Sequence, residues 1–132
     1  MSIFEHNIQT PHQGFLDITS KVAEDVRKAD VDHGIAVIFV PHTTAAVTIN
    51  ENADPDVTYD MTMAYDKAFP DNPRFRHMEG NSAAHCKSSA MGPSLTVIVE
   101  GGQLLLGTWQ GIYFCEFDGP RNRRYMVKVM KG

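Results

Sequence analysis

The order of strand-like and helix-like segments is the feature of this sequence that most constrains its fold. Short apolar or alternating segments predict strands, and segments with apolar residues every three or four positions predict helices. Along the 132 residues the predicted order is strands, one helix, strands, two helices and then four strands. This order predicts an α+β fold with antiparallel sheets. With no linker and no internal repeat, we expect a single domain spanning residues 1–132.

The predicted strands are short and are bounded by turn residues. They span residues 3–9, 14–18, 35–40, 45–50, 95–100, 103–106, 108–117 and 123–131. Between the second and third of them, Val22 and Val26 stand at helical spacing and predict an amphipathic helix. The charged residues of this helix, including Asp25, are expected to face solvent.

Two further helices have clear start and stop signals. Asp54 as N-cap and Pro55 as first helical residue predict the start of the second helix, and Pro70 predicts its end. Asn81 or Ser82 can cap the third helix, which a Gly-Pro pair ends ten residues later, at positions 92 and 93. The third helix is therefore expected to begin directly behind a polar loop.

Composition narrows the class of protein. Hydrophobic residues make up 42% and charged residues 21%, which excludes a disordered chain. The net charge of -4 argues against a nucleic-acid-binding surface, although three arginines cluster at positions 121, 123 and 124. No apolar run is long enough to cross a membrane, no signal peptide begins the chain, and the two cysteines form no C-x-x-C. We therefore expect a cytoplasmic protein without membrane or nucleic-acid partners.

Three histidines are candidates for a metal site. His42 follows a predicted strand, His77 lies in the loop before the third helix, and His85 lies in its first turn. Three imidazoles with an open fourth position are a known arrangement for catalytic zinc. The spacing alone leaves an alternative open, in which the three imidazoles form hydrogen bonds in a polar pocket without metal.

Two carboxylates are candidates for acid–base chemistry. Glu51 and Glu79 lie on no amphipathic face, so solvation does not explain their positions. Both stand among side-chain amides, at Asn50, Asn52 and Asn81. This grouping indicates a polar cavity rather than a solvated surface.

An anion site is predicted at the start of the third helix. The first amides of a helix lack internal partners and bind phosphate-like groups. Here those amides belong to Gly80, Asn81 and Ser82, with Lys87 or Arg121 supplying positive charge.

Four other side chains complete the candidate residues at this stage. Trp109 and Gln110 lie in the segment Gly107-Thr108-Trp109-Gln110-Gly111, where the tryptophan is expected to be a core or interface residue or, given its polar neighbours, part of a pocket wall. Arg123 and Arg124 are expected to be solvated at a turn and an edge strand.

Five motifs in this order resemble the YjbQ-like family. They are His42-Thr43-Thr44-Ala45 and residues 49–57, 77–85, 107–112 and 116–121. The similarity extends from about residue 35 to the end, and the first third matches only in general layout. The resemblance implies a sandwich of antiparallel sheets with about three helices, assembled as a homotrimer whose sites are completed across subunits. Family members are described as secondary thiamine-phosphate synthases, which join a pyrimidine diphosphate to a thiazole phosphate and release pyrophosphate.

The residues and the resemblance together give a candidate site in three parts. The catalytic candidates are Glu51, Glu79 and His85. The candidates for binding an anionic or phosphorylated metabolite are Thr43, Asn50, Asn52, Gly80, Asn81, Ser82, Trp109, Gln110 and Arg121. His42, His77 and His85 would hold a divalent ion, zinc or a similar metal by their chemistry, or magnesium by the needs of a diphosphate. The alternatives are a metal-dependent hydrolase or lyase on another small anionic metabolite, and a non-catalytic trimer that binds metal or metabolite.

Overall fold

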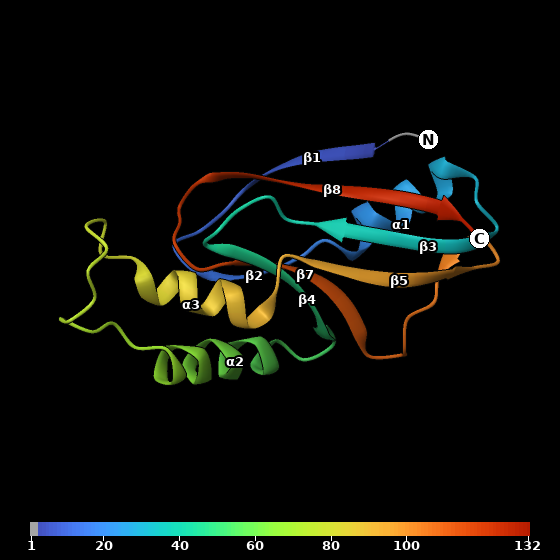
Figure 1. Ribbon diagram of the computed structural model, residues 1–132. Helices are drawn as coiled ribbons and strands as arrows, with labels where there is room; N and C mark the ends of the chain where they lie inside the picture. The colour runs from blue at the N-terminus through green and yellow to red at the C-terminus, as the bar shows by residue number, and fades with distance from the viewer. Residues whose placement is uncertain (1–2) are drawn as a thin grey trace.

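Two antiparallel sheets packed against each other form the framework of the computed structural model, which describes residues 3–132 (Figure 1). The strands are β1 (Ile3–Gln9), β2 (Gly14–Asp17), β3 (His33–Phe39), β4 (Ala45–Glu51), β5 (Ser94–Glu100), β6 (Gln103–Leu104), β7 (Gln110–Glu116) and β8 (Asn122–Lys131). The helices are α1 (Thr19–Ala29), α2 (Pro55–Ala68) and α3 (Ser82–Met91). The predicted α+β fold with antiparallel sheets and three helices is confirmed for the described part of the chain.

The strands divide into a five-stranded sheet, in the order β1-β8-β3-β5-β6, and a three-stranded sheet, in the order β2-β7-β4. The predicted glycine turn joins β5 to β6, and both Gly101 and Gly102 have the positive φ that this hairpin requires. The strand predicted over residues 108–117 begins at Gln110 instead, because Thr108 and Trp109 belong to a turn in which Gln110 N donates to Gly107 O.

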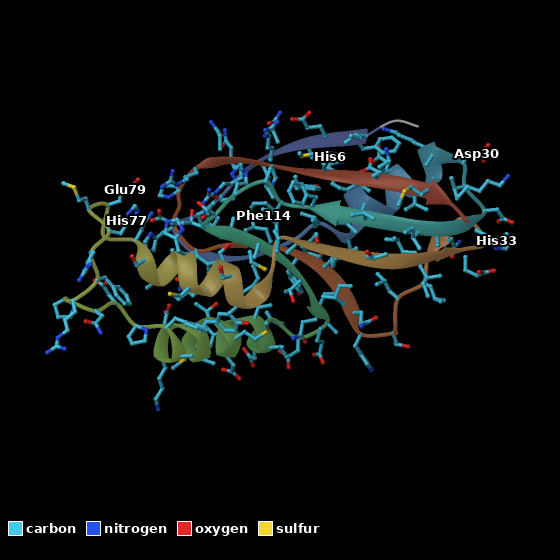
Figure 2. All side chains as sticks on the ribbon, in the orientation of Figure 1. His6, Asp30, His33, His77, Glu79 and Phe114 are labelled. Atoms are coloured by element: carbon cyan, nitrogen blue, oxygen red, sulfur yellow. The ribbon has the colours of Figure 1, made fainter. Side chains whose placement is uncertain are left out.

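The main core lies between the two sheets. Alternation along the strands turns Ile38 and Val127 of the larger sheet inward, where they meet Ile112 and Phe114 of the smaller one. Helix α1 adds Val22 to the same core, together with Val26, as its helical spacing predicts. Figure 2 shows Phe114 deep within the body of the molecule. Burial of these large side chains at the sheet interface is the main stabilisation of the fold.

The prediction that Asp25 faces solvent is wrong. Its side chain on α1 is only 2% exposed, and Oδ2 lies 2.6 Å from His6 Nε2 on β1. The imidazole of His6 also stacks on Tyr125, with ring centroids 4.9 Å apart. A carboxylate removed from water needs such a partner, and His6 provides it.

Helices α2 and α3 cover the outer face of the smaller sheet (Figure 1). A second apolar cluster there contains Ala84 of α3, Cys115 and Phe117, with Tyr65 of α2 packed against it. Asp54 caps α2 as predicted, its Oδ1 accepting from Asp56 N at 2.9 Å. None of the residues of α2 is fully buried, so this helix lies at the surface of the domain. None of the helices within residues 3–132 is both long and apolar enough to cross a membrane.

Candidate functional site

A cavity of about 410 Å³ brings together residues from three parts of the chain that are far apart in the sequence. Its walls come from the connection between β3 and β4, the loop before α3 with the first turn of that helix, and the start of β8 with the residue before it. They are formed by Pro41, His42, Thr43, Thr44, His77, Glu79, Asn81, His85, Arg121 and Arg123. We call this cavity the histidine–arginine pocket. Seven of the residues predicted from the sequence meet in it: His42, Thr43, His77, Glu79, Asn81, His85 and Arg121.

Two of the three predicted histidines are in direct contact. The rings of His77 and His85 stand edge to face, with centroids 5.4 Å apart. Glu79 lies beside them, its Oε1 4.0 Å from His77 Nε2. Figure 2 shows His77 and Glu79 on the loop that leads into α3. The helix start therefore aims one imidazole at a second one held by the loop.

His42 is held from the other side of the pocket. Its Nε2 accepts a hydrogen bond of 3.0 Å from the backbone N–H of Arg124. Burial and the charge of Arg123 lower the pKa of His42 below its ordinary value, so the imidazole is neutral at pH 7. Only its Nδ1 is then free to contact a ligand.

The three histidines do not form a closed metal centre by themselves. Within residues 3–132, no three side chains of His, Cys, Asp or Glu are grouped closely enough to hold one metal ion. The three imidazoles line one cavity, but His42 has already used one ring nitrogen as an acceptor. The predicted metal ion therefore stays a prediction.

The prediction that Arg123 is solvated is wrong. Its side chain is 5% exposed, and the side chain of Glu116, with which it pairs, is fully buried. Arg123 Nε donates to Glu116 Oε1 at 2.7 Å, and Nη2 donates to Oε2 at 2.6 Å and to Thr44 Oγ1 at 2.8 Å. The same guanidinium lines the histidine–arginine pocket, where it is a fixed positive charge.

Glu116 has a full set of donors around it. Besides Arg123, it accepts from Thr10 Oγ1 at 2.5 Å and from Asp118 N at 2.9 Å. Burial alone would raise the pKa of Glu116, but these hydrogen bonds and the charge of Arg123 lower it overall. Sequence reasoning missed this residue, although a carboxylate at the end of the apolar strand β7, directly before Phe117, is a signal that a buried cation must lie nearby.

Arg121 is exposed, as a ligand-binding residue should be, but it is not free to move. Its Nε donates to Asp118 O at 2.8 Å and its Nη2 donates to Asp118 Oδ2 at 2.9 Å. The same Oδ2 accepts from Asn81 Nδ2 at 2.8 Å. Asp118, which sequence reasoning also missed, therefore positions both Arg121 and Asn81 at the edge of the pocket.

The alternative in which Lys87 supplies charge to the anion site is wrong. Lys87 is a buried residue of α3, and its Nζ donates to Gln13 Oε1 at 3.1 Å and pairs closely with Asp66. The helix does begin where predicted, at Ser82 after Asn81 as N-cap, and Gly80 before it has a φ of 71°. The side chain of Asn81 leaves the helix amides uncapped and bonds to Asp118 instead.

The remaining candidates lie at the other end of the smaller sheet. Residues Ala45 and Glu116 pair at the pocket end of β4 and β7, and Glu51 pairs with Gln110 at the far end. Six residue steps along an extended strand separate the two ends by roughly 20 Å. A second group forms there from Asn50, Glu51, Asn52, Trp109 and Gln110. We call it the distal group.

The distal group is ordered by hydrogen bonds of its own. The backbone N–H of Asn52 donates to Trp109 O at 3.0 Å, and Asn52 Nδ2 donates to Asp17 Oδ2 at 3.2 Å. A Cβ at Gly111 would collide with the Asn52 side chain, 2.4 Å from its Nδ2. Trp109 is 62% exposed, so it is not a core residue of this chain. One chain thus presents two separate groups of predicted site residues.

Comparison with known proteins identifies the family of this chain. The chain is 54% identical over 122 residues to the UPF0047 protein YugU of Bacillus subtilis, covering 92% of each protein. It is 50% identical over 129 residues to the UPF0047 protein MJ1081 of Methanocaldococcus jannaschii, covering 97% of this chain and 94% of that protein. A crystal structure of an uncharacterised conserved YjbQ/UPF0047 family protein from Clostridium acetobutylicum superposes with a TM-score of 0.94 at 53% identity, covering 96% and 99% of the two chains. The family model "UPF0047 protein YjbQ-like" matches residues 4–132, so the similarity reaches further toward the N-terminus than the sequence motifs do, and the chain belongs to the YjbQ-like UPF0047 family.

Proposed function

We propose that this chain is an enzyme that binds the phosphate or diphosphate group of a small metabolite in the histidine–arginine pocket. The observation that carries the proposal is the charge of the lining. Two guanidiniums, of Arg121 and Arg123, and three imidazoles face one carboxylate, that of Glu79. In each guanidinium Nε and Nη2 already bond to Asp118 or to Glu116 and Thr44, and Nη1 has no partner among residues 3–132. An N–H donor on a cation that is already held in place can bind a phosphate oxygen with little loss of side-chain freedom.

The proposed reaction is the transfer expected from the resemblance to thiamine-phosphate synthases. The ring nitrogen of a thiazole phosphate would form a bond to the methylene carbon of a pyrimidine diphosphate, while the C–O bond to the diphosphate breaks and pyrophosphate leaves with the bonding electron pair. The main demand is to stabilise the negative charge of the leaving group, which Arg121 and Arg123 are placed to do. His85 and Glu79 would orient the substrate, because the attacking nitrogen carries no proton to remove.

The test combines a binding and an activity measurement on the full chain. We expect calorimetric titration to show saturable binding of pyrophosphate, and a coupled assay to show pyrophosphate release when the pyrimidine diphosphate and the thiazole phosphate are mixed with the protein. Binding without release would reject the transferase reaction but keep the anion site. Absence of both would reject the proposed function.

The affinity for a divalent anion is expected to rise as the pH falls from about 8 to about 5.5. Because the pKa of His42 is lowered in the free protein, the imidazole is neutral at pH 7. An anion bound at Nδ1 favours the protonated form, in which Nε2 carries the added proton and gives up its hydrogen bond from Arg124 N. Binding then takes up a proton, and each unit by which the anion raises this pKa corresponds to about tenfold in affinity at low pH. Sulfate is a suitable probe, because its own charge does not change over this range.

The matched variants are His42→Asn and His33→Asn. His33 lies on the far end of β3 between Asp32 and Glu100, outside the pocket, so its replacement should leave the pH dependence of sulfate binding unchanged. His42→Asn should make the dependence shallower. An identical slope in both variants would contradict the role assigned to His42.

We also propose that the chain is a homotrimer in which the distal group of one subunit approaches the histidine–arginine pocket of another. Glu51 and Trp109 would then reach the substrate, which they cannot do within one chain. A surface for assembly is available: the outer face of the larger sheet carries Ile35, Phe39 and Ile98, the last of them 54% exposed, and the described helices leave it uncovered. Light scattering should give three times the chain mass of 14.7 kDa. A monomer would reject the shared site.

A metal-dependent hydrolase or lyase acting on another small anionic metabolite is the second candidate. The observation that favours it is the contact between His77 and His85 with Glu79 beside them. Elemental mass spectrometry of the untagged protein should then find about one transition-metal ion per chain, lost in His42→Ala and in His85→Ala. A metal-free parent protein with full activity would exclude this candidate, whereas retained ligand without turnover of any substrate would indicate a non-catalytic binding protein.

A further inference from the structure

A second cavity, of about 430 Å³, borders the histidine–arginine pocket and shares Asn81 with it. It lies between α2, α3 and the connection from β7 to β8. The residues that determine its chemistry are Asp66, Asp71 and Asp118, with Phe69, Phe117 and Asn81. We call it the acidic pocket. Apart from Asn81 and Asp118, which also serve the histidine–arginine pocket, its lining has no part in the proposed reaction site.

The two neighbouring cavities differ in the sign of their charge. Three carboxylates and the imidazole of His12 line the acidic pocket. Its one ammonium group, that of Lys87, is buried and already donates to Asp66 and Gln13. A hydrogen bond from Lys87 lowers the pKa of Asp66. Burial would raise the pKa of Asp118, but hydrogen bonds from Asn81 and Arg121 lower it overall. Both carboxylates therefore stay ionised at neutral pH.

The lining of the acidic pocket has acceptor oxygens that the described chain leaves without donors. Asp118 uses Oδ2 for Asn81 and Arg121, and Oδ1 receives no hydrogen bond from residues 3–132. In the same stretch of chain, Asn81 Oδ1 also has no partner, but it is buried, so a ligand group in the cavity reaches it only if the Asn81 side chain turns. Asp71 uses Oδ1 for the N–H of Asn72, and its second oxygen receives no donor from that stretch either. A group rich in donors and poor in acceptors fits these positions, and an ammonium group has three N–H donors and no acceptor.

The rest of the acidic pocket is apolar and well supported. Phe117 stacks on Tyr65 of α2, with ring centroids 6.2 Å apart and planes within 2° of parallel. Phe69, next to the end of α2, packs against the same tyrosine at 5.8 Å. Such a wall suits the hydrocarbon part of a ligand and adds the attraction of aromatic faces for a cation.

We propose that the acidic pocket is a second subsite, which takes an ammonium-bearing hydrocarbon part of the same metabolite whose anionic group occupies the histidine–arginine pocket. The ligand class is therefore an amino-substituted phosphate ester, which takes the place of the pyrimidine diphosphate and thiazole phosphate of the proposed transfer as the compound that fits both cavities. Asn81 stands between the two charges, bound to Asp118 and, at 3.5 Å, to Glu79. This inference rests on the proposed anion site and adds what the rest of the ligand must carry.

The test compares two series of probes that differ in one group. One series consists of alkyl phosphates of increasing chain length, and the other of ω-aminoalkyl phosphates with the same chain lengths. Each compound, and inorganic phosphate, is titrated into the full chain by calorimetry. We expect one chain length at which the amino compound binds about tenfold more tightly than its alkyl counterpart, since each tenfold corresponds to about 1.4 kcal/mol. This preference should fall severalfold in Asp71→Asn and in Asp118→Asn.

The controls separate this subsite from the anion site. Asp60→Asn removes an exposed carboxylate of α2 that does not line the cavity, and it should keep the full preference. Asp71→Asn should keep its affinity for inorganic phosphate. Equal affinity of both series at every length, or a preference unchanged in Asp71→Asn and Asp118→Asn, would overturn the second subsite alone. Failure of the parent protein to bind inorganic phosphate would overturn the anion site and this subsite together.

Discussion

Replacement of Arg123 by methionine is expected to lower the free energy of unfolding by about 3–5 kcal/mol, the usual cost of removing one partner of a buried ion pair. The variant leaves the carboxylate of Glu116 fully buried and without its cation. Thr10 and the N–H of Asp118 still donate to it, but they bring no charge. Chemical denaturation at pH 7 measures this loss, which is a large share of the roughly 5–15 kcal/mol that stabilises a domain.

The loss should depend on pH in a defined direction. In the parent protein the pKa of Glu116 is lowered, so the stability that the ion pair contributes is present at neutral pH and is lost as the pH falls through that lowered pKa. In the variant, burial without Arg123 raises the pKa of Glu116, and its penalty is relieved once the carboxyl is protonated. The difference in stability between parent and variant should therefore narrow as the pH falls from 7 toward 4.

Two further variants make this prediction specific. Glu116→Gln in addition to Arg123→Met removes the unpaired charge, so the double variant should recover a large part of the lost stability. Arg124→Met removes an exposed arginine paired with Glu5 and should cost less than about 1 kcal/mol. Equal costs for Arg123→Met and Arg124→Met, or no recovery in the double variant, would contradict the buried pair as a structural support of the pocket.

Local signals in the sequence were sufficient where the interaction itself is local. Asp54 and Pro55 define the start of α2, because the cap bond joins residues two positions apart. Paired glycines define the turn between β5 and β6 for the same reason. Element types and their order therefore follow from the sequence, and with them the α+β class.

The buried charges were misjudged, because their partners come from distant parts of the fold. Asp25 was assigned to the polar side of α1, yet it stands three positions after Val22 and next to Val26, on the buried stripe. Its partner, His6, lies on β1. Arg123 stands two positions before Tyr125 in β8 and therefore shares the inner face of the strand with it. In both cases the periodicity of the element predicts a buried side chain, whereas the free-energy cost of burying a charge predicts an exposed one.

The candidate site could be predicted in its parts but not in its assembly. The motifs around His42 and His77 contain the residues that line the cavity, and the fold joins them with Arg121. The motif around Glu51 is only a few residues from His42 in sequence, yet an extended β4 carries it to the opposite end of the sheet. Sequence proximity misleads here, because a strand separates its ends more than any other element of equal length.

Replacement of Arg121 by alanine is expected to weaken binding of inorganic phosphate or pyrophosphate by about tenfold to a hundredfold, since a hydrogen bond to a charged group is worth about 1.5–3 kcal/mol. Two contacts to Asp118 hold its guanidinium at the edge of the histidine–arginine pocket, so little side-chain freedom is lost on binding. Arg121→Lys keeps the charge but loses the planar pair of donors, and its affinity should lie between those of the parent and the alanine variant. Calorimetric titration at one fixed salt concentration gives the three dissociation constants.

Arg124→Ala is the matched control, because it removes the same charge from an exposed arginine nearby. Arg124 pairs with Glu5 through its side chain and contacts His42 only through its backbone N–H, which alanine retains. A general attraction between a basic surface and an anion would make both alanine variants bind equally weakly, and would weaken both further as salt is added. A built site makes the loss specific to Arg121, with Arg124→Ala within about twofold of the parent. The ratio of these two constants therefore decides between a phosphate-binding pocket and a merely basic surface, and a ratio near one would remove the basis of the proposed function.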